Sequence, residues 1–266
     1  MNADNYLQLN RQAWNNKVDS HLSSDFYNLE AFKHGWNSIN DIEKPLLGDL
    51  KGKSLLHLQC HFGQDTLSLA RMGAQCTGVD LSDKAIATAK ALADELQLSA
   101  KFVASDVYSI DQHLKEKYDL VFSSYGTIGW LPELKRWAQL IYDHLKPGGN
   151  FVFAEFHPVV WMFDNDFKEL EFSYFNRQRI EELESGTYAD PKAEIENTTV
   201  SWNHDLAEVL QALLDTGLKL ERFEEYDYSP YNCFKNMVKI DEAKYQIKGM
   251  EGKLPMVYAL KMSKEH

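Results

Sequence analysis

The stretch SLLHLQCHFGQDTLSLARMGAQCTGVD, residues 54–80, decides the fold of this chain. An apolar segment over 55–58 reads as a strand that ends in a tight turn, the next segment (65–72) reads as a helix, and a second apolar strand ends at Asp80. A nucleotide-type cofactor needs this order, because a turn faces its polar end and a carboxylate accepts from its ribose hydroxyls. The turn holds only one glycine, Gly63, where such turns usually hold two or three.

The alternation of strand and helix continues along most of the chain. Apolar runs predict strands at 101–104, 118–123, 150–155, 218–228 and 256–261, and helical patterns predict helices at 82–96, 134–145 and 204–214. Strand–helix–strand units connect by right-handed crossovers, so this rhythm predicts an α/β fold with a mostly parallel sheet.

The remaining segments are expected to attach to the same domain, because no repeat or low-complexity linker separates them. We predict one domain over residues 1–266, with a helical cap or lid at 1–50 and a cofactor-binding core at 51–158. An aromatic and acidic insertion, predicted to cover the substrate, occupies 159–202. Residues 203–266 are expected to complete the sheet with a helix and strands.

Composition narrows the classes of function. The 266 residues are 44% hydrophobic and carry a formal net charge of −12, which argues against binding along a nucleic-acid backbone. Three cysteines without a Cys-x-x-Cys pair predict neither a disulfide framework nor a zinc site, and we expect no metal. No segment resembles a secretion signal or a membrane span, so a cytoplasmic protein without a membrane partner is expected.

Five segments, in order, resemble motifs of the class I S-adenosylmethionine-dependent methyltransferases. They are the first-motif turn HLQCHFG (57–63), the segment GVDLS (78–82), ASDV (104–107), the fourth strand with its exit (118–125), and LKPGG (145–149). The resemblance covers roughly residues 50–262. It implies a Rossmann-like sheet of seven strands, mostly parallel with the last strand antiparallel, with helices on both faces and an insertion after the fifth strand.

The resemblance also implies a cofactor, S-adenosylmethionine, with S-adenosylhomocysteine as its product. Asp80 would accept from the ribose hydroxyls, Leu81 would flank the adenine, and Asp106 with Val107 would contact the edge of that ring. An alternative for Asp80 is a helix N-cap, although Ser82 already suits that role. The cofactor-binding residues implied are Gln59, Cys60, His61, Gly63, Asp80, Leu81, Ser82, Asp106, Val107 and Ser123.

The first motif departs from the family pattern. His57 stands where an acid is usual, and Gln59 and His61 replace two glycines. Either the site is lost, or the two side chains stand beside the methionine part of the cofactor and supply polar contacts. The string HLQCHFG resembles the first motif of a group of uncharacterised bacterial methyltransferases, which favours the second interpretation. Cys60 lies near His57 and His61, but a metal shared by the two histidines would need a third ligand that the sequence does not show.

Methyl transfer depends mainly on positioning, and a general base is needed only where the acceptor starts protonated. Tyr125, after the fourth strand, and His157, after the fifth, are the catalytic candidates; either could also play a packing or loop-bonding role. The fourth-strand exit lacks the Asn/Asp-Pro-Pro-aromatic motif of nucleobase methyltransferases. We therefore expect methyl transfer to a small molecule, with a non-catalytic ligand-binding module or an NAD-dependent oxidoreductase as alternatives, and the oligomeric state is left open.

Overall fold

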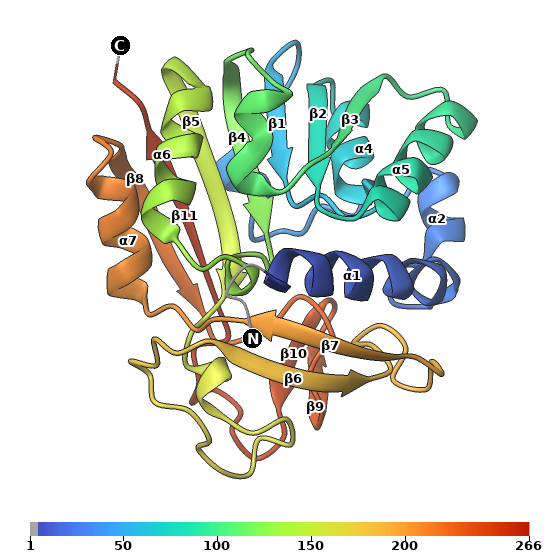
Figure 1. The fold of residues 1–266 in the computed structure, drawn as a ribbon, viewed down its shortest axis with the longest axis vertical. Helices are drawn as coiled ribbons and strands as arrows, with labels where there is room; N and C mark the ends of the chain where they lie inside the picture. The colour runs from blue at the N-terminus through green and yellow to red at the C-terminus, as the bar shows by residue number, and fades with distance from the viewer. Residues whose placement is uncertain (1–4, 266) are drawn as a thin grey trace.

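A computed structural model describes residues 5–265 and contains one seven-stranded sheet in the order β3-β2-β1-β4-β5-β11-β8 (Figure 1). The strands are β1 (Ser54–Leu58), β2 (Gln75–Asp80), β3 (Ala100–Ala104), β4 (Tyr118–Ser124), β5 (Leu145–Phe156), β8 (Lys219–Tyr226) and β11 (Val257–Ser263). Strands β1 to β5 pair in parallel, whereas β11 runs antiparallel to both of its neighbours. The predicted fold class is confirmed.

Helices cover both faces of this sheet. The helices of the described chain are α1 (Tyr6–Ser23), α2 (Leu29–Lys33), α3 (Lys44–Leu47), α4 (Gln64–Arg71), α5 (Asp83–Glu95), α6 (Leu134–His144) and α7 (Leu206–Leu214). On one face α6 and α7 pack against the sheet, where the buried Trp137 ring lies 5.6 Å from Phe151 and 5.5 Å from Phe153. The opposite face is packed by α3, α4 and α5. Burial on both faces explains why the central strands read as continuous apolar runs.

The turn LKPGG lies inside a strand. Strand β5 starts at Leu145, not at the predicted residue 150, and its pairing with β4 jumps from Leu145 opposite Tyr118 to Asn150 opposite Leu120. The extra residues form a bulge. Gly149 is required there because a Cβ atom would lie 2.9 Å from the carbonyl oxygen of Lys146.

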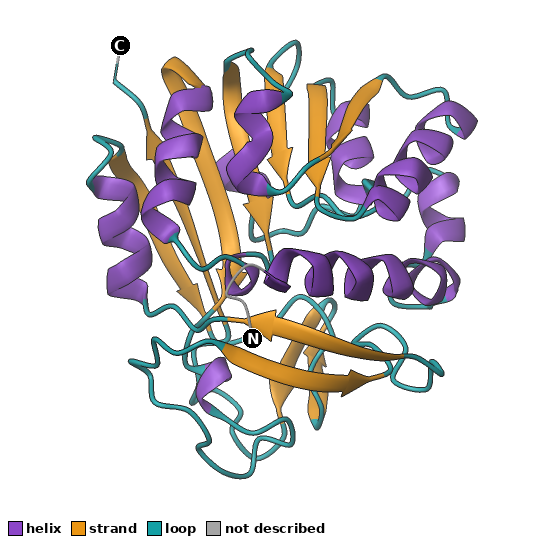
Figure 2. Cartoon of the chain, in the orientation of Figure 1, coloured by secondary structure: helices purple, strands orange, loops and turns teal. Residues whose placement is uncertain are grey.

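Two hairpins were missed from the sequence. Strands β6 (Ile180–Ser185) and β7 (Glu196–Ser201) pair antiparallel within the predicted insertion, and β9 (Met237–Asp241) pairs with β10 (Lys244–Ile247). Figure 2 shows both below the main sheet. Strand β6 is mostly exposed and carries three glutamates, so it lacks the apolar alternation by which strands are recognised.

Helix α1 crosses the edge of the sheet at which the parallel strands end (Figure 1). It is tied to β7 by the Asn10 side chain, whose amide donates to the Val200 carbonyl at 2.8 Å and whose oxygen accepts from the Val200 N–H at 2.9 Å. Within residues 5–265, none of the helices combines the length and apolar character that a membrane crossing requires. The α1–β7 layer therefore covers the edge at which α/β sheets bind their ligands.

Candidate functional site

The turn between β1 and α4 has the backbone shape of a glycine-rich turn, although only one of its three left-handed residues is a glycine. Gln59 has φ 55°, His61 has φ 50° and Gly63 has φ 79°, so three alternate residues are left-handed. Left-handed backbone costs a residue with a side chain about 1 kcal/mol or more. The sequence thus keeps the shape of the turn at that cost.

Gly63 is required by its neighbours as well as by its φ. A Cβ atom there would lie 2.7 Å from the Phe102 ring of β3 and 2.9 Å from the Ala89 Cβ of α5. Those distances are shorter than contacts between carbon atoms allow. The single glycine therefore lets the turn pack closely against β3 and α5.

Asp80, at the end of β2, joins two turns. Its Oδ2 accepts the His61 N–H at 2.7 Å, and its Oδ1 accepts the Ser82 N–H at 2.8 Å. Ser82 is the N-cap of α5, as predicted, since its hydroxyl accepts the Ala85 N–H at 3.0 Å. Burial raises the pKa of the Asp80 carboxyl to about 6. The carboxylate keeps further lone-pair sites for a ribose diol.

The residues predicted to surround the adenine lie at the ends of β2 and β3. Ser105 donates its backbone N–H to the Asp80 carbonyl at 2.9 Å, which joins the two exits. Asp106 is half-buried, and no hydrogen bond between described residues uses its carboxylate. Val107 is buried and Leu81 is half-buried. Their assignment to the cofactor stays a prediction.

The Gln59 and His61 side chains lie under the cover. The Gln59 amide donates to the Thr127 carbonyl at 2.8 Å, and the His61 Nε2 lies 2.8 Å from the His21 Nδ1 of α1. Among the described residues, Gln59 Oε1, His61 Nδ1 and His21 Nε2 are buried without a hydrogen-bond partner. Unpaired buried polar atoms are costly, and the carboxylate and amine of a methionine moiety would satisfy them. These residues therefore fit S-adenosylmethionine.

The other predicted residues near the turn are buried or hydrogen-bonded to other groups of the protein. Cys60 is buried, and its N–H donates to the Val79 carbonyl at 3.0 Å. The Ser123 hydroxyl lies 3.2 Å from the Thr127 hydroxyl. His57 binds Thr66 at 2.8 Å, away from His61, and among residues 5–265 no three His, Cys, Asp or Glu side chains gather as a metal would need.

Sequence reasoning missed Glu155, which shapes the β4 exit. Its buried carboxylate accepts backbone N–H groups from Gly126, Thr127 (2.7 Å), Ile128 (3.3 Å) and Phe156 (2.7 Å). Tyr125 (φ 47°) and Gly126 (φ 71°) are both left-handed, so successive N–H groups point to one spot. Such a concavity binds an anion, and here the anion is a side chain of the neighbouring strand.

Tyr125, a predicted catalytic residue, faces a buried acid. Its hydroxyl donates to Oε2 of Glu43 at 2.7 Å, and Oε1 of Glu43 accepts the Asn40 N–H at 2.8 Å. Glu43 is fully buried, and burial raises its pKa from an ordinary value of 4.5 to about 7. Nothing in the sequence around Glu43 signals this contact, because 82 residues separate it from Tyr125.

His157, the other catalytic candidate, belongs to a different set of contacts. Its Nε2 lies 2.9 Å from Oε1 of Glu225 on β8, and its Nδ1 accepts the Val159 N–H at 3.2 Å. The ring is buried and packs against Tyr258. One ring nitrogen is thus bonded to β8 and the other within its own loop, which fits a loop-bonding role, and none of these contacts reaches the turn.

Aromatic side chains close the cover over the turn. Trp14 of α1 lies 5.3 Å from the His61 ring and 5.5 Å from Trp130. Lys17, which is 3% exposed, lies over the Trp14 ring at 5.1 Å and pairs with Glu184 of β6 at 2.8 Å. The predicted cap and insertion therefore meet over the turn.

The buried acids predict a pH dependence of stability. Since the folded pKa of Glu43 lies above its ordinary value, the folded protein binds a proton between about pH 7 and 4.5 that the unfolded chain releases. Compared with a Glu43→Gln variant, the wild type should gain up to about 1.4 kcal/mol of unfolding free energy per pH unit as pH falls through that window. Urea unfolding at pH 8, 7, 6 and 5 measures this.

The comparison with the variant is needed because buried histidines act in the opposite direction. Burial lowers the pKa of His21 and of His57 to about 3, so the unfolded chain binds their protons first and stability falls below about pH 6.5. Both proteins share this effect, and it cancels in the difference. If the difference in unfolding free energy between the wild type and Glu43→Gln stays constant from pH 8 to 5, the raised pKa of Glu43 is contradicted.

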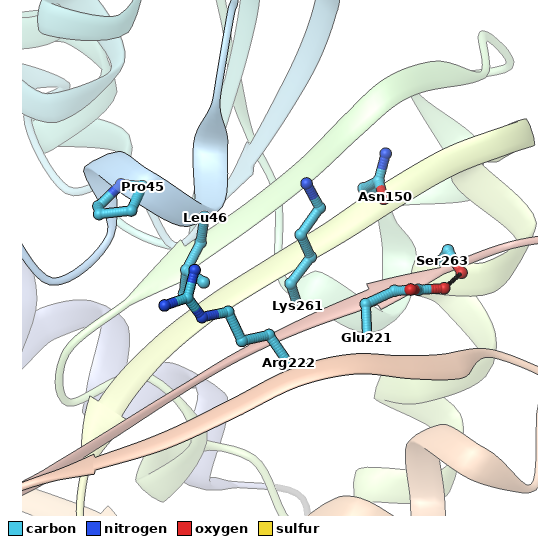
Figure 3. Close-up of a pocket in the computed structure, with 7 residues that line it drawn as sticks. All are labelled: Pro45, Leu46, Asn150, Glu221, Arg222, Lys261 and Ser263. Atoms are coloured by element: carbon cyan, nitrogen blue, oxygen red, sulfur yellow. Dashed lines mark hydrogen bonds between the residues drawn. The ribbon is translucent and has the colours of Figure 1, made fainter.

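A surface pocket of about 380 Å³ lies beside β5, β8 and β11 (Figure 3). It is lined by Pro45, Leu46, Asn150, Glu221, Arg222, Lys261 and Ser263. Asn150 lies toward the beginning of β5, whereas the turn and the β4 exit lie where the parallel strands end. This pocket is therefore not part of the candidate site.

Known proteins match the fold and the segment of the chain that holds the turn. Residues 55–149, a little over a third of the chain, match the family model of the methyltransferase domain. A ubiquinone biosynthesis O-methyltransferase of Coxiella burnetii is 27% identical over 138 residues, 51% of this chain and 58% of that protein. The uncharacterized methyltransferase YbaJ of Bacillus subtilis is 24% identical over 234 residues, 81% of this chain and 89% of its own.

Solved structures share the architecture. An S-adenosylmethionine-dependent methyltransferase from Mesorhizobium loti superposes with a TM-score of 0.60 at 22% identity, over 87% of this chain and all of its own. The chain thus has the class I methyltransferase fold. Together the matches support an S-adenosylmethionine-dependent methyltransferase. The chain spans a little over half the length of the Coxiella relative.

Proposed function

We propose that this chain transfers a methyl group from S-adenosylmethionine to a small-molecule acceptor. The observation that carries the proposal is the left-handed backbone of Gln59, His61 and Gly63, anchored by Asp80. When bound, S-adenosylmethionine supplies an activated methyl group on a sulfonium centre. The family match over this same segment supports the assignment.

In this proposal, the residues of the chain bind the cofactor and orient it for methyl transfer. Asp80 accepts from the ribose hydroxyls, and Asp106 with Val107 contacts the adenine edge. The unpaired Gln59 and His61 atoms receive the methionine end. Trp14 and the rest of the α1 cover exclude water, which strengthens each polar contact beneath it. We assign Tyr125, which lies in the exit loop of the strand next to β1, to the acceptor side.

Calorimetry with S-adenosylhomocysteine and with NAD tests the proposal. Binding of S-adenosylhomocysteine in the micromolar range, with no heat from NAD at 1 mM, is the expected result. An oxidoreductase would show the reverse preference. Absence of S-adenosylhomocysteine binding at millimolar concentration would remove the function, and binding without turnover over a broad acceptor panel would indicate a non-catalytic module.

Glycine at the two variant positions tests what their side chains do. Gln59→Gly and His61→Gly keep the left-handed backbone and remove the polar atoms. Each is expected to weaken S-adenosylhomocysteine about tenfold by calorimetry, because a hydrogen bond is lost at the methionine end. Relief of backbone strain should offset the lost side-chain contacts, so the unfolding free energy should change by less than about 1 kcal/mol. Tighter binding by both variants would show that the side chains only obstruct a glycine turn.

A further inference from the structure

Four tyrosines and a phenylalanine surround the acceptor side of the turn. The Tyr27 ring lies 5.7 Å from the His61 ring, and its hydroxyl bonds that of Tyr188. Phe26 lies 5.3 Å from Tyr188 and stacks on Tyr231 at 5.4 Å, and Tyr231 lies 5.1 Å from Tyr125. We name Phe26, Tyr27, Tyr125, Tyr188 and Tyr231 the tyrosine cluster. It runs without a gap from the turn to the β4 exit.

Two acids, the buried Glu43 and the half-buried Asp65, lie beside the tyrosine cluster without a positive partner. Glu43 accepts from the Tyr125 hydroxyl, and Asp65 accepts from the Ser38 hydroxyl at 2.5 Å. Burial raises the pKa of Asp65 to about 6, as it raises that of Glu43. Among residues 5–265, no lysine, arginine or histidine forms an ion pair with either carboxylate. A cation beside these two carboxylates would favour their charged form, and none of the described residues supplies one.

A histidine within the tyrosine cluster also lacks a partner. The His21 ring is fully buried, 4.9 Å from Tyr188 and 5.2 Å from Tyr27. Its Nδ1 bonds His61, and its Nε2 has no partner among the described residues. This nitrogen is one of the atoms that the methionine moiety would satisfy, so the tyrosine cluster lies directly beside the cofactor end of the turn. Tyr188 is 37% exposed, so the tyrosine cluster has one rim that faces solvent.

We infer that the tyrosine cluster with Glu43 and Asp65 binds the methyl acceptor, and that this acceptor is an amine that is positively charged in solution. Aromatic faces attract a cation by about 0.5–2 kcal/mol each, and buried carboxylates attract it further. An acidic acceptor has no partner here, because the cationic Lys17 is already paired with Glu184. The inference rests on the proposed function and names its substrate class.

Tyr125 and Glu43 provide for the proton that the amine must lose. The Tyr125 oxygen accepts a proton from the ammonium group while the hydroxyl proton moves to the Glu43 carboxylate, so the amine becomes neutral, the tyrosine stays neutral and the acid is protonated. The freed nitrogen lone pair forms the bond to the methyl carbon. The electron pair of the broken carbon–sulfur bond stays on sulfur, and the product is a methylated ammonium ion with S-adenosylhomocysteine. Glu43 acts through Tyr125 and is a positioning residue.

Three probes of one shape test the substrate class. The full chain, saturated with S-adenosylhomocysteine, is titrated by calorimetry with phenethylamine, 2-phenylethanol and phenylacetate. The charged amine should bind at least about tenfold more tightly than the neutral alcohol, and phenylacetate should bind most weakly. Transfer of labelled methyl from S-adenosylmethionine should be seen with the amine alone.

Variants distinguish an effect of the Glu43 charge on amine binding from a structural role of Glu43. Glu43→Gln should reduce the amine-to-alcohol affinity ratio from about ten to below three, whereas Glu221→Gln, on exposed β8, should leave it unchanged. A merely structural role of Glu43 would weaken both probes equally and keep the ratio. Should Glu43→Gln fail to fold, Tyr188→Ala at the exposed rim should lower amine affinity about fivefold with an unchanged S-adenosylhomocysteine affinity.

The outcomes distinguish the two proposals. Failure to bind S-adenosylhomocysteine overturns the proposed function. Where S-adenosylhomocysteine binds normally, two results would overturn the amine inference. One is that the alcohol or phenylacetate binds as tightly as phenethylamine. The other is that neither Glu43→Gln nor Tyr188→Ala alters the preference for the amine.

Discussion

Asp80→Ala is expected to raise the dissociation constant for S-adenosylhomocysteine about 100-fold, a loss of about 2.8 kcal/mol. The carboxylate would accept from the ribose, and it already fixes the turn through the His61 N–H and α5 through the Ser82 N–H. Alanine therefore removes a ligand contact and leaves two backbone donors unpaired. Calorimetry measures the affinity, and urea unfolding measures the cost to the protein.

Two further variants make the Asp80 result interpretable. Asp80→Asn keeps one acceptor oxygen for the backbone, so its stability should lie nearer to the wild type while its affinity stays low. Asp94→Asn, on the exposed side of α5, is the matched control and should leave affinity unchanged. If Asp80→Ala binds within threefold of the wild type, the ribose assignment is wrong.

Glu155→Ala is expected to cost about 3–5 kcal/mol of unfolding free energy, the largest stability effect at the site. The side chain accepts backbone N–H groups from Gly126, Thr127, Ile128 and Phe156, and alanine leaves these buried donors without a partner. A loss of that size should lower the melting temperature by about 6–20 °C in a protein of this length. Thermal unfolding followed by circular dichroism measures it.

Glu155→Gln and Glu221→Ala complete the test. Glutamine keeps one acceptor oxygen, but its amide N–H groups would face the backbone N–H groups that the carboxylate accepts. We therefore expect a loss of unfolding free energy smaller than that of Glu155→Ala. Glu221 is exposed on β8 of the same sheet, and its truncation should change the unfolding free energy by less than about 0.5 kcal/mol. Equal effects of Glu155→Ala and Glu221→Ala would mean that water replaces the carboxylate without cost.

The fold could be predicted because its signals are local. The central strands are buried on both faces, so each reads as an apolar run, and Ser82 caps α5 as its sequence indicates. The hairpin β6–β7 could not be predicted, since exposed glutamates give it no alternation and its stability comes from pairing and from α1. Local pattern thus predicted the buried sheet and missed the hairpin.

The candidate site could be predicted only in part. Asp80 follows a strand, where an acid has a recognisable place, whereas Glu43 meets Tyr125 across 82 residues of chain. Gln59 and His61 looked like departures from a glycine turn because residue type was taken to fix backbone shape. Their positive φ angles show that the surrounding contacts can hold the shape without glycine.

The bonds between α1 and β7 have a consequence for how the chain folds. Asn10 and Val200 lie 190 residues apart in sequence, so the first helix completes its contacts only after most of the chain has been organised. Closing so long a loop costs conformational entropy that the early, neighbouring contacts of the sheet do not. We expect the sheet to form first and α1 to dock late, so that amides in α1 gain protection from hydrogen exchange after those in β1 and β4 during refolding.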